Sequence, residues 1–229
     1  MLYVVATPIG NLEDFSARAV TVLRNVDLIL AEDTRTTRVL LDRYQIQTEL
    51  LSYHQHSTLQ KIDRIIRLLE EGKKLALVSD AGTPGINDPG GFLISKIIEA
   101  LPDTKIVPIP GANAAISALS VSGFPADQFV YLGFPPHKKG RQTFFKEIVL
   151  RPETLVFYES KHRIVKSLEA LMAAVPHRPI VVARELTKQF ETIYRGMPEE
   201  VLMKLKHTNI LGEFIVVVGP KQRKKHEQE

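Results

Sequence analysis

Short apolar runs alternate with amphipathic stretches along the first half of the chain. The uninterrupted apolar runs predict buried β-strands at residues 2–7, 27–32, 74–79 and 105–110. Helices are predicted after them, at residues 16–26, 36–44, 57–72, 91–101 and from about residue 111. The best-marked helix begins at a candidate Ser57 cap and stops at Gly72. This repeated order of strand then helix predicts a mainly parallel α/β sheet.

The second half of the chain starts a new pattern. Residues 123–141 are rich in Pro, Gly and aromatic side chains and hold no long helix, so we expect them to carry the crossing between two domains. Strands are predicted beyond them at residues 154–160, 179–187, 190–196 and 212–220, and helices at 161–175 and 197–206. No helix separates the second and third of these strands, which predicts a mixed sheet. We therefore predict an N-terminal α/β domain (1–117), a C-terminal α/β domain (118–220) and a basic, polar tail (221–229).

Four loops each follow a predicted strand of the first half: TPIGN, AEDTR, SDAGTPG and IPGAN. Ligands bind beyond the carboxyl ends of such strands, so we expect these loops to form one site. The longest loop, Val78–Gly90, holds two aspartates and no basic residue, which favours a neutral or cationic ligand over a phosphate. Gly82 and Gly85 allow close approach of the backbone. Asp80 is expected either to accept hydrogen bonds from a ligand or to cap a turn.

The amino-acid composition limits the classes of protein and of site that are possible. The 229 residues carry a formal net charge of +4, partly in the tail KQRKKHEQE, which permits nucleic-acid binding without demonstrating it. The absence of cysteine excludes disulfides, thiolate nucleophiles and cysteine zinc sites. No apolar run approaches the roughly 18 residues of a membrane helix, and the apolar N-terminus is too brief for a signal peptide. We expect a cytoplasmic protein with no membrane association and no metal.

Candidate catalytic residues lie after the second strand and in the stretch SYHQH. The segment AEDTRTTR offers carboxylates and cations at a strand end, although a helix cap with surface arginines is an equal alternative. His54 and His56 have no evident third metal ligand, so they are either RNA contacts, a base or exposed loop residues. No residue can be named the base. The weak candidates are Glu32, Asp33, Arg35 and His54, with Arg38 nearby.

Seven motifs together resemble the tetrapyrrole methylase superfamily, whose members use S-adenosylmethionine: VATPIGNLEDFSARAVTVL, AEDTR, VSDAGTPGINDPG, PGANAAISAL, YESKHRI, ARELTK and GEFIVVVG. The resemblance covers residues 2–220, and AEDTR with SDAGTPG is similar to the ribosomal small-subunit RNA methyltransferase I subfamily. It implies two α/β domains of the class III methyltransferase type with the cofactor in the cleft between them. It also implies a homodimer and methylation of a cytidine ribose 2′-hydroxyl in small-subunit (16S) ribosomal RNA.

The resemblance further implies the site residues. S-adenosyl-L-methionine has a sulfonium, an amino acid and an adenosine but no phosphate, which suits a loop without lysine. By matching motifs, the implied cofactor contacts are Ile9, Gly10, Asp80, Gly82, Thr83, Ala112, Asn113, Ala114, Ala115, Tyr158, Ala183, Arg184, Gly212 and Glu213.

Two basic segments are candidate RNA contacts. PPHKKGRQTFF places Lys138, Lys139 and Arg141 beside aromatic residues that could stack on a base but could equally face the core. ESKHRI places Lys161 and Arg163 at a helix start, where a solvated basic turn is the alternative.

Two other functions stay open: a methyltransferase acting on a tetrapyrrole or another small molecule, and a non-enzymatic RNA-binding ribosome-assembly factor. The sequence leaves open the base, the target nucleotide, and whether the substrate is free ribosomal RNA or an assembled small subunit.

Overall fold

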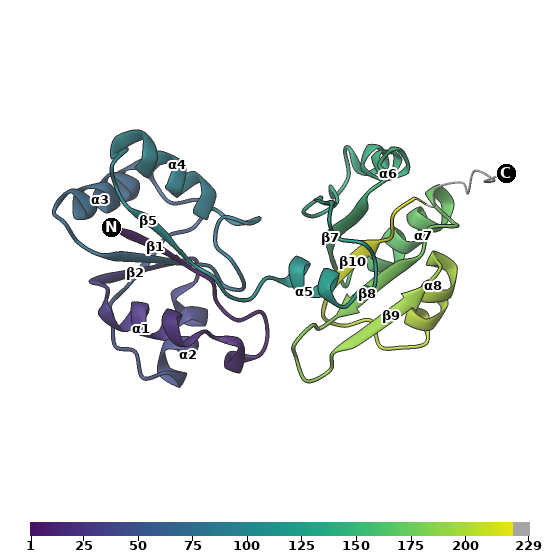
Figure 1. Cartoon of the computed structure of the whole chain (residues 1–229), viewed down its shortest axis with the longest axis horizontal. Helices are drawn as coiled ribbons and strands as arrows, with labels where there is room; N and C mark the ends of the chain where they lie inside the picture. Colours follow the sequence, from purple (N-terminus) through teal and green to yellow (C-terminus); the bar gives the residue numbers. More distant parts are fainter. Residues whose placement is uncertain (222–229) are drawn as a thin grey trace. The chain divides into compact units, whose positions relative to one another are not determined.

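The structure is a computed structural model that describes residues 1–221. The chain divides into two compact units, residues 1–113 and residues from 114 on (Figure 1). The predicted division after residue 117 concerns independently folding domains and stays a prediction. The predicted tail, residues 221–229, lies outside the described residues except for Lys221.

The first unit is built on a five-stranded sheet with the strand order β3-β2-β4-β1-β5. Every neighbouring pair is parallel, which confirms the predicted sheet type. Its strands are β1 (Leu2–Val5), β2 (Leu28–Ala31), β3 (Leu50–Ser52), β4 (Leu75–Val78) and β5 (Ile106–Ile109). Its helices are the 3-10 helix η1 (Leu12–Asp14), α1 (Ala17–Asn25), α2 (Thr34–Arg43), α3 (Leu59–Glu70) and α4 (Gly90–Ala100).

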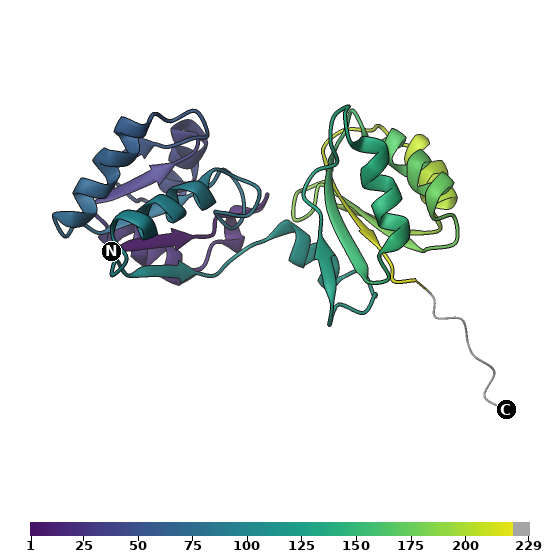
Figure 2. The ribbon, with the colours of Figure 1, turned by 90° about the horizontal axis from the view of Figure 1, so that it is seen from above.

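Helices cover both faces of this sheet (Figures 1 and 2). Alternate residues of a strand point to opposite faces, so Ile29 of β2 packs with α1 and α2, whereas Leu28 and Leu30 pack with α3 and α4. Both faces are therefore buried, and this is why the strands appear in the sequence as unbroken apolar runs.

The structure shows which residues cap the two helices whose caps were predicted from the sequence. The Ser16 hydroxyl accepts a hydrogen bond from the Ala19 amide and caps α1 as predicted. The cap of α3 is Thr58, which accepts from the Lys61 amide, and not the predicted Ser57. The Ser57 hydroxyl instead accepts from the His54 amide (3.0 Å), so its capping capacity is used within the preceding turn.

The second unit has a mixed sheet with the strand order β6-β7-β10-β8-β9. β6 and β7 are parallel and the other neighbours are antiparallel, which confirms the predicted mixed sheet. Its strands are β6 (Phe129–Tyr131), β7 (Thr154–Ser160), β8 (Ile180–Arg184), β9 (Thr192–Gly196) and β10 (Glu213–Val218). Its helices are α5 (Ala114–Ser120), α6 (Arg141–Leu150), α7 (Ile164–Ala174) and α8 (Pro198–Lys206).

Helices α6, α7 and α8 bury one face of this sheet, with Phe157 and Phe214 among the buried strand residues. Helix α5 packs against β7 and β10 through the face that carries Tyr158, whose hydroxyl accepts from the Ala115 amide. Residues 123–141, expected to carry a crossing between domains, lie inside this unit and contribute β6. Among the described residues, no helix is long and apolar enough to cross a membrane.

Candidate functional site

Four loops meet at the carboxyl edge of the first sheet, as the sequence predicts. We call them the edge loops: residues 6–11, 32–33, 79–89 and 110–113. Thr7 and Gly82 exchange two backbone hydrogen bonds, of 2.9 and 3.1 Å. The Asp33 amide donates to Oδ1 of Asp80 (3.0 Å), and the Thr83 hydroxyl donates to the Ala112 carbonyl (3.2 Å). Every edge loop is thus bonded to another, which holds their backbones in one fixed arrangement.

The shape of loop 79–89 depends on its glycines and on Asp88. Gly82 and Gly85 have φ angles of +82° and +86°, a region that residues with a side chain rarely adopt. The Asp88 carboxylate accepts hydrogen bonds from the Gly85 amide (2.8 Å) and the Gly90 amide (2.7 Å). Gly90 is buried and a Cβ there would lie 2.9 Å from the Gly85 nitrogen. Asp88 therefore closes the loop, and Asp80 is the aspartate of this segment that is available to a ligand.

The carboxylates of the edge loops have different electrostatic environments. Burial raises the pKa of Asp80. Burial and the neighbouring charge of Asp80 raise the pKa of Glu32. By contrast, hydrogen bonds from Arg35 lower the pKa of Asp33 to about 2. Asp80 and Glu32 are thus carboxylates whose negative charge is poorly compensated, and a cationic ligand would relieve this.

The catalytic candidates have mainly local roles. Asp33 caps α2 by accepting from the Arg35 amide (2.8 Å) and forms an ion pair with the Arg35 guanidinium (2.6 Å). Nδ1 of His54 accepts from the His56 amide at 3.2 Å. Residues 1–221 contain no group of three side chains suited to hold a metal ion. These contacts favour the capping alternative for Asp33 and identify no base.

The implied cofactor residues of the second unit form two groups. Tyr158 and Ala183 both pair with Ile215, so they occupy one row across β7, β10 and β8. Tyr158 bonds Ala115, which places α5 at that row. The second group is Arg184, Gly212 and Glu213. Nε of Arg184 donates to the carbonyl of the neighbouring Leu211 at 2.7 Å.

Sequence reasoning missed two charged residues beside the second group. Lys188 donates to Glu185 and to Glu213, each at 2.9 Å. Glu185 has a φ of +50°, and its side chain occupies the space that a Cβ on Gly212 would need. The signal available in the sequence is the run of charges in ARELTK, at the end of the strand predicted over residues 179–187.

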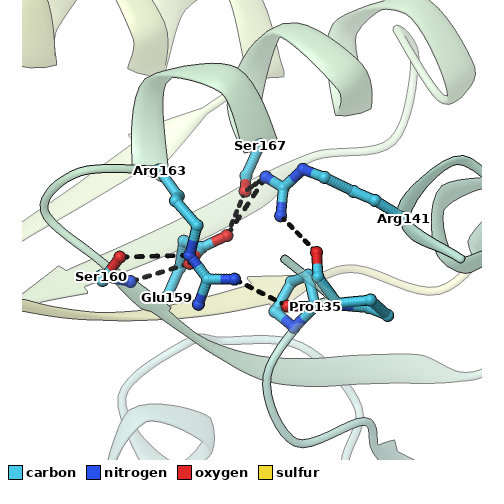
Figure 3. A network of polar contacts seen from close by, with 7 residues as sticks. Pro135, Arg141, Glu159, Ser160, Arg163 and Ser167 are labelled. Atoms are coloured by element: carbon cyan, nitrogen blue, oxygen red, sulfur yellow. Dashed lines mark hydrogen bonds and ion pairs between the residues drawn. The ribbon is translucent and has the colours of Figure 1, made fainter. Parts of the chain in front are cut away.

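The predicted RNA-binding residues differ in exposure. Lys138, Lys139 and Lys161 are exposed. Arg141 and Arg163 instead form ion pairs with the buried Glu159, and only 17% and 15% of their side chains are exposed (Figure 3).

Of the neighbouring aromatic residues, Phe145 lies in the core and Phe144 is packed against it. Phe134 is 46% exposed, and the centroid of its ring lies 5.4 Å from that of the Tyr158 ring. The core alternative therefore holds for Phe144 and Phe145.

Comparisons with known proteins give consistent matches. A sequence model of the family described as Tetrapyrrole (Corrin/Porphyrin) Methylases matches residues 1–202. The curated ribosomal RNA small subunit methyltransferase I of Escherichia coli O157:H7 is 48% identical over 221 residues, 95% of this chain and 77% of that protein. The Thermotoga maritima protein of the same name is 42% identical over 221 residues, 96% of this chain and 99% of that protein.

Solved structures extend the likeness at lower identity. A diphthine synthase matches with a TM-score of 0.72 and 15% identity, over 95% of this chain and 89% of that one. The uroporphyrin-III-C-methyltransferase of Thermus thermophilus matches with a TM-score of 0.65 and 21% identity, over 95% and 93%. At these identities the likeness shows the fold alone.

Proposed function

Because the chain belongs to the tetrapyrrole methylase family, and within it to the ribosomal RNA small subunit methyltransferase I subfamily, we propose that it is an S-adenosylmethionine-dependent methyltransferase of small-subunit ribosomal RNA. The two α/β units and the resemblance found in the sequence are confirmed. The observation that carries the proposal is 42–48% identity across nearly the whole chain to relatives of that name.

The edge loops suit the cofactor. S-adenosylmethionine supplies a methyl group on a positively charged sulfur, so the transfer needs positioning more than further activation. The cofactor carries cationic groups, and Asp80 and Glu32 offer carboxylates with raised pKa values and little compensating charge. Gly82 and Gly85, with positive φ angles, let the backbone approach an adenosine closely. Ile9, Thr83 and Ala112 would line the same edge.

The target ribose oxygen is a weak nucleophile while it is protonated. Glu32 is a candidate to accept its proton, because its raised pKa makes it a stronger base than an ordinary glutamate. Asp33 and Arg35 already bind each other, so their contribution would be to hold the start of α2 in place.

The finer proposals rest on the subfamily. The target is the ribose 2′-hydroxyl of a cytidine, and the protein acts as a cytoplasmic homodimer. Lys138, Lys139 and Lys161 bind phosphates of the RNA, since they are exposed cations. Such contacts position the RNA and carry no sequence information. Light scattering at micromolar concentration tests the dimer, and a single species at the 25.7 kDa monomer mass would contradict it.

Mass mapping of ribose methylation in ribosomal RNA tests the proposed function. Cells that lack this protein should lose one 2′-O-methyl group on a small-subunit cytidine, and the gene returned on a plasmid should restore it. Purified protein should transfer labelled methyl groups to the RNA or the subunit from those cells. Unchanged RNA with methylation of a porphyrinogen would support the small-molecule alternative. RNA binding with no heat of cofactor binding up to millimolar concentration would support the assembly-factor alternative.

A further inference from the structure

A buried carboxylate in the second unit binds two arginines at once. The Glu159 side chain is fully buried. Its Oε1 lies 2.9 Å from Nε of Arg163, and its Oε2 lies 3.3 Å from Nη2 of Arg141 and 2.5 Å from the Ser167 hydroxyl that donates to it. The Ser160 amide donates to Oε1 at 2.9 Å. Each carboxylate oxygen is therefore satisfied, as a buried charge requires.

The two arginines also donate hydrogen bonds to backbone carbonyls of the segment before α6. Nη1 of Arg163 donates to the Pro135 carbonyl at 2.8 Å (Figure 3). Nη1 of Arg141 donates to the Pro136 carbonyl at 3.3 Å. Proline has no amide N–H, so residues 135 and 136 cannot donate to a neighbouring strand. These two residues can bond through their carbonyl oxygens alone, and the guanidinium groups are the donors to those oxygens.

These contacts connect three parts of the unit. Glu159 lies on β7, Arg141 is the first residue of α6, and Arg163 is the residue directly before α7. The segment 135–140 carries the exposed Lys138 and Lys139, and the turn before α7 carries the exposed Lys161. The network thus joins the two segments that present the candidate phosphate contacts.

We propose that Glu159 is a positioning residue for RNA binding: it orients Arg141 and Arg163, which hold the segment 135–140 against the turn at residues 161–163 so that their lysines form one phosphate-binding surface. This inference rests on the proposed function. It gives the two arginines a structural role in place of the direct phosphate contact that the sequence suggested.

Replacing Glu159 by Gln tests the inference, because a positioning role and a simple charge effect predict opposite changes in the affinity for RNA. The substitution keeps the size of the side chain and removes one negative charge from the unit, so that its net charge rises by one. If the surface attracts RNA only through net charge, E159Q should bind RNA more tightly and with a steeper salt dependence. If Glu159 positions the lysines, E159Q should raise the apparent KM for RNA about tenfold and flatten the salt slope by about one unit for each phosphate that the lysines no longer neutralise. Cofactor affinity and kcat should stay within about twofold of the wild type.

A matched charge control is available on α7. Glu169 is exposed and pairs with Lys206 at 3.5 Å, so E169Q makes the same charge change away from the network. It should leave the KM for RNA unchanged or slightly lower. Equal KM values for E159Q and E169Q would overturn the inference.

Two further measurements keep the inference testable if E159Q does not fold or if the wild type does not act on RNA. R141K keeps the charge but loses the planar fork, so positioning predicts a raised KM, whereas a simple phosphate contact predicts little change because lysine also binds phosphate. Hydrogen exchange of the amides of residues 141 and 144, which donate to the carbonyls of Lys138 and Gly140, should be faster in either variant than in the wild type. Unchanged exchange would overturn the positioning role by itself, and failure of wild-type methyl transfer alone would reject only the proposed function.

Discussion

Asp80 allows a sharp test of the cofactor site, because stability and affinity should respond differently to its substitution. Asp80→Asn keeps a side-chain oxygen that can accept from the Asp33 amide, the 3.0 Å bond that joins two edge loops. It removes only the negative charge. Burial raises the pKa of Asp80, so its ionised form is less favourable in the folded chain than in the unfolded chain. Above that raised pKa, neutral Asn should therefore leave the unliganded protein equally stable or slightly more stable.

The expected loss of affinity follows from electrostatics. Two unit charges about 4 Å apart interact by roughly 4 kcal/mol at an effective dielectric constant of about 20. The Asp80 residue as a whole is exposed to solvent, although its carboxylate is partly desolvated, and exposure reduces such pairs to about 1 kcal/mol. A loss of about 1.4 kcal/mol lies between these limits and corresponds to tenfold weaker binding of S-adenosylmethionine. Weakening of S-adenosylhomocysteine by the same factor would identify the cofactor amine as the partner of Asp80, and a smaller effect would identify the sulfonium.

Titration calorimetry and thermal unfolding, both at neutral pH, measure the two effects. Asp27→Asn is the matched control, because Asp27 also accepts from a backbone amide, that of Lys74 at 2.7 Å. Asp27 directly precedes β2 and so lies at the opposite, amino edge of the sheet. It should leave cofactor affinity unchanged. The reasoning is refuted if the two variants bind the cofactor equally well, or if Asp80→Asn lowers the melting temperature more than Asp27→Asn does.

Three further outcomes are expected. Gly82→Ala and Gly72→Ala should each cost roughly 1–2 kcal/mol of stability, because their φ angles are +82° and +80°, but only the former should weaken cofactor binding; equal affinities in calorimetry would contradict this. Arg178→Met should lower the free energy of unfolding in urea by at least about 3 kcal/mol, because it removes the buried donor to four backbone carbonyls; a loss below about 1 kcal/mol would show that those carbonyls find other partners. Cofactor affinity should fall as the pH is lowered through the raised pKa values of Asp80 and Glu32, since protonation removes their charge. Calorimetry that finds the same affinity at neutral pH and at the lowest pH at which the protein stays folded would contradict this.

The first unit was predictable from sequence because its strands are buried on both faces. Continuous apolar runs mark such strands directly, and their parallel arrangement puts every following loop on the same edge. The short edge strand β3 was missed, since its residues Leu50–Ser52 are only partly buried and form no long apolar run. In the second unit, α6 was missed because Phe144 and Phe145 are adjacent, as are Val149 and Leu150, which gives no clear helical stripe.

The site could be predicted only in part. Glycines and aspartates in loops after strands pointed to the edge loops, because these residue types are costly or unusual unless the backbone or a ligand requires them. The roles of the charged residues could not be read in the same way. Arg141 closely follows two lysines, and the sequence alone does not show that it pairs with a buried carboxylate eighteen positions later. Which of several nearby charges is buried is decided by tertiary pairing, and local sequence carries no record of that pairing.

The division of roles between fold and loops explains how one architecture can serve unlike substrates. Proteins named diphthine synthase and uroporphyrin-III-C-methyltransferase share this fold at only 15% and 21% identity. A shared fold places function in the sites that it carries, so the choice of substrate must lie in residues that the architecture does not require. In this chain the segment 135–140 belongs to no helix or strand, carries exposed lysines, and is held by side-chain contacts to its prolines rather than by sheet pairing. Its sequence could therefore change with little cost to the sheet, whereas the network around Glu159 that holds it could not.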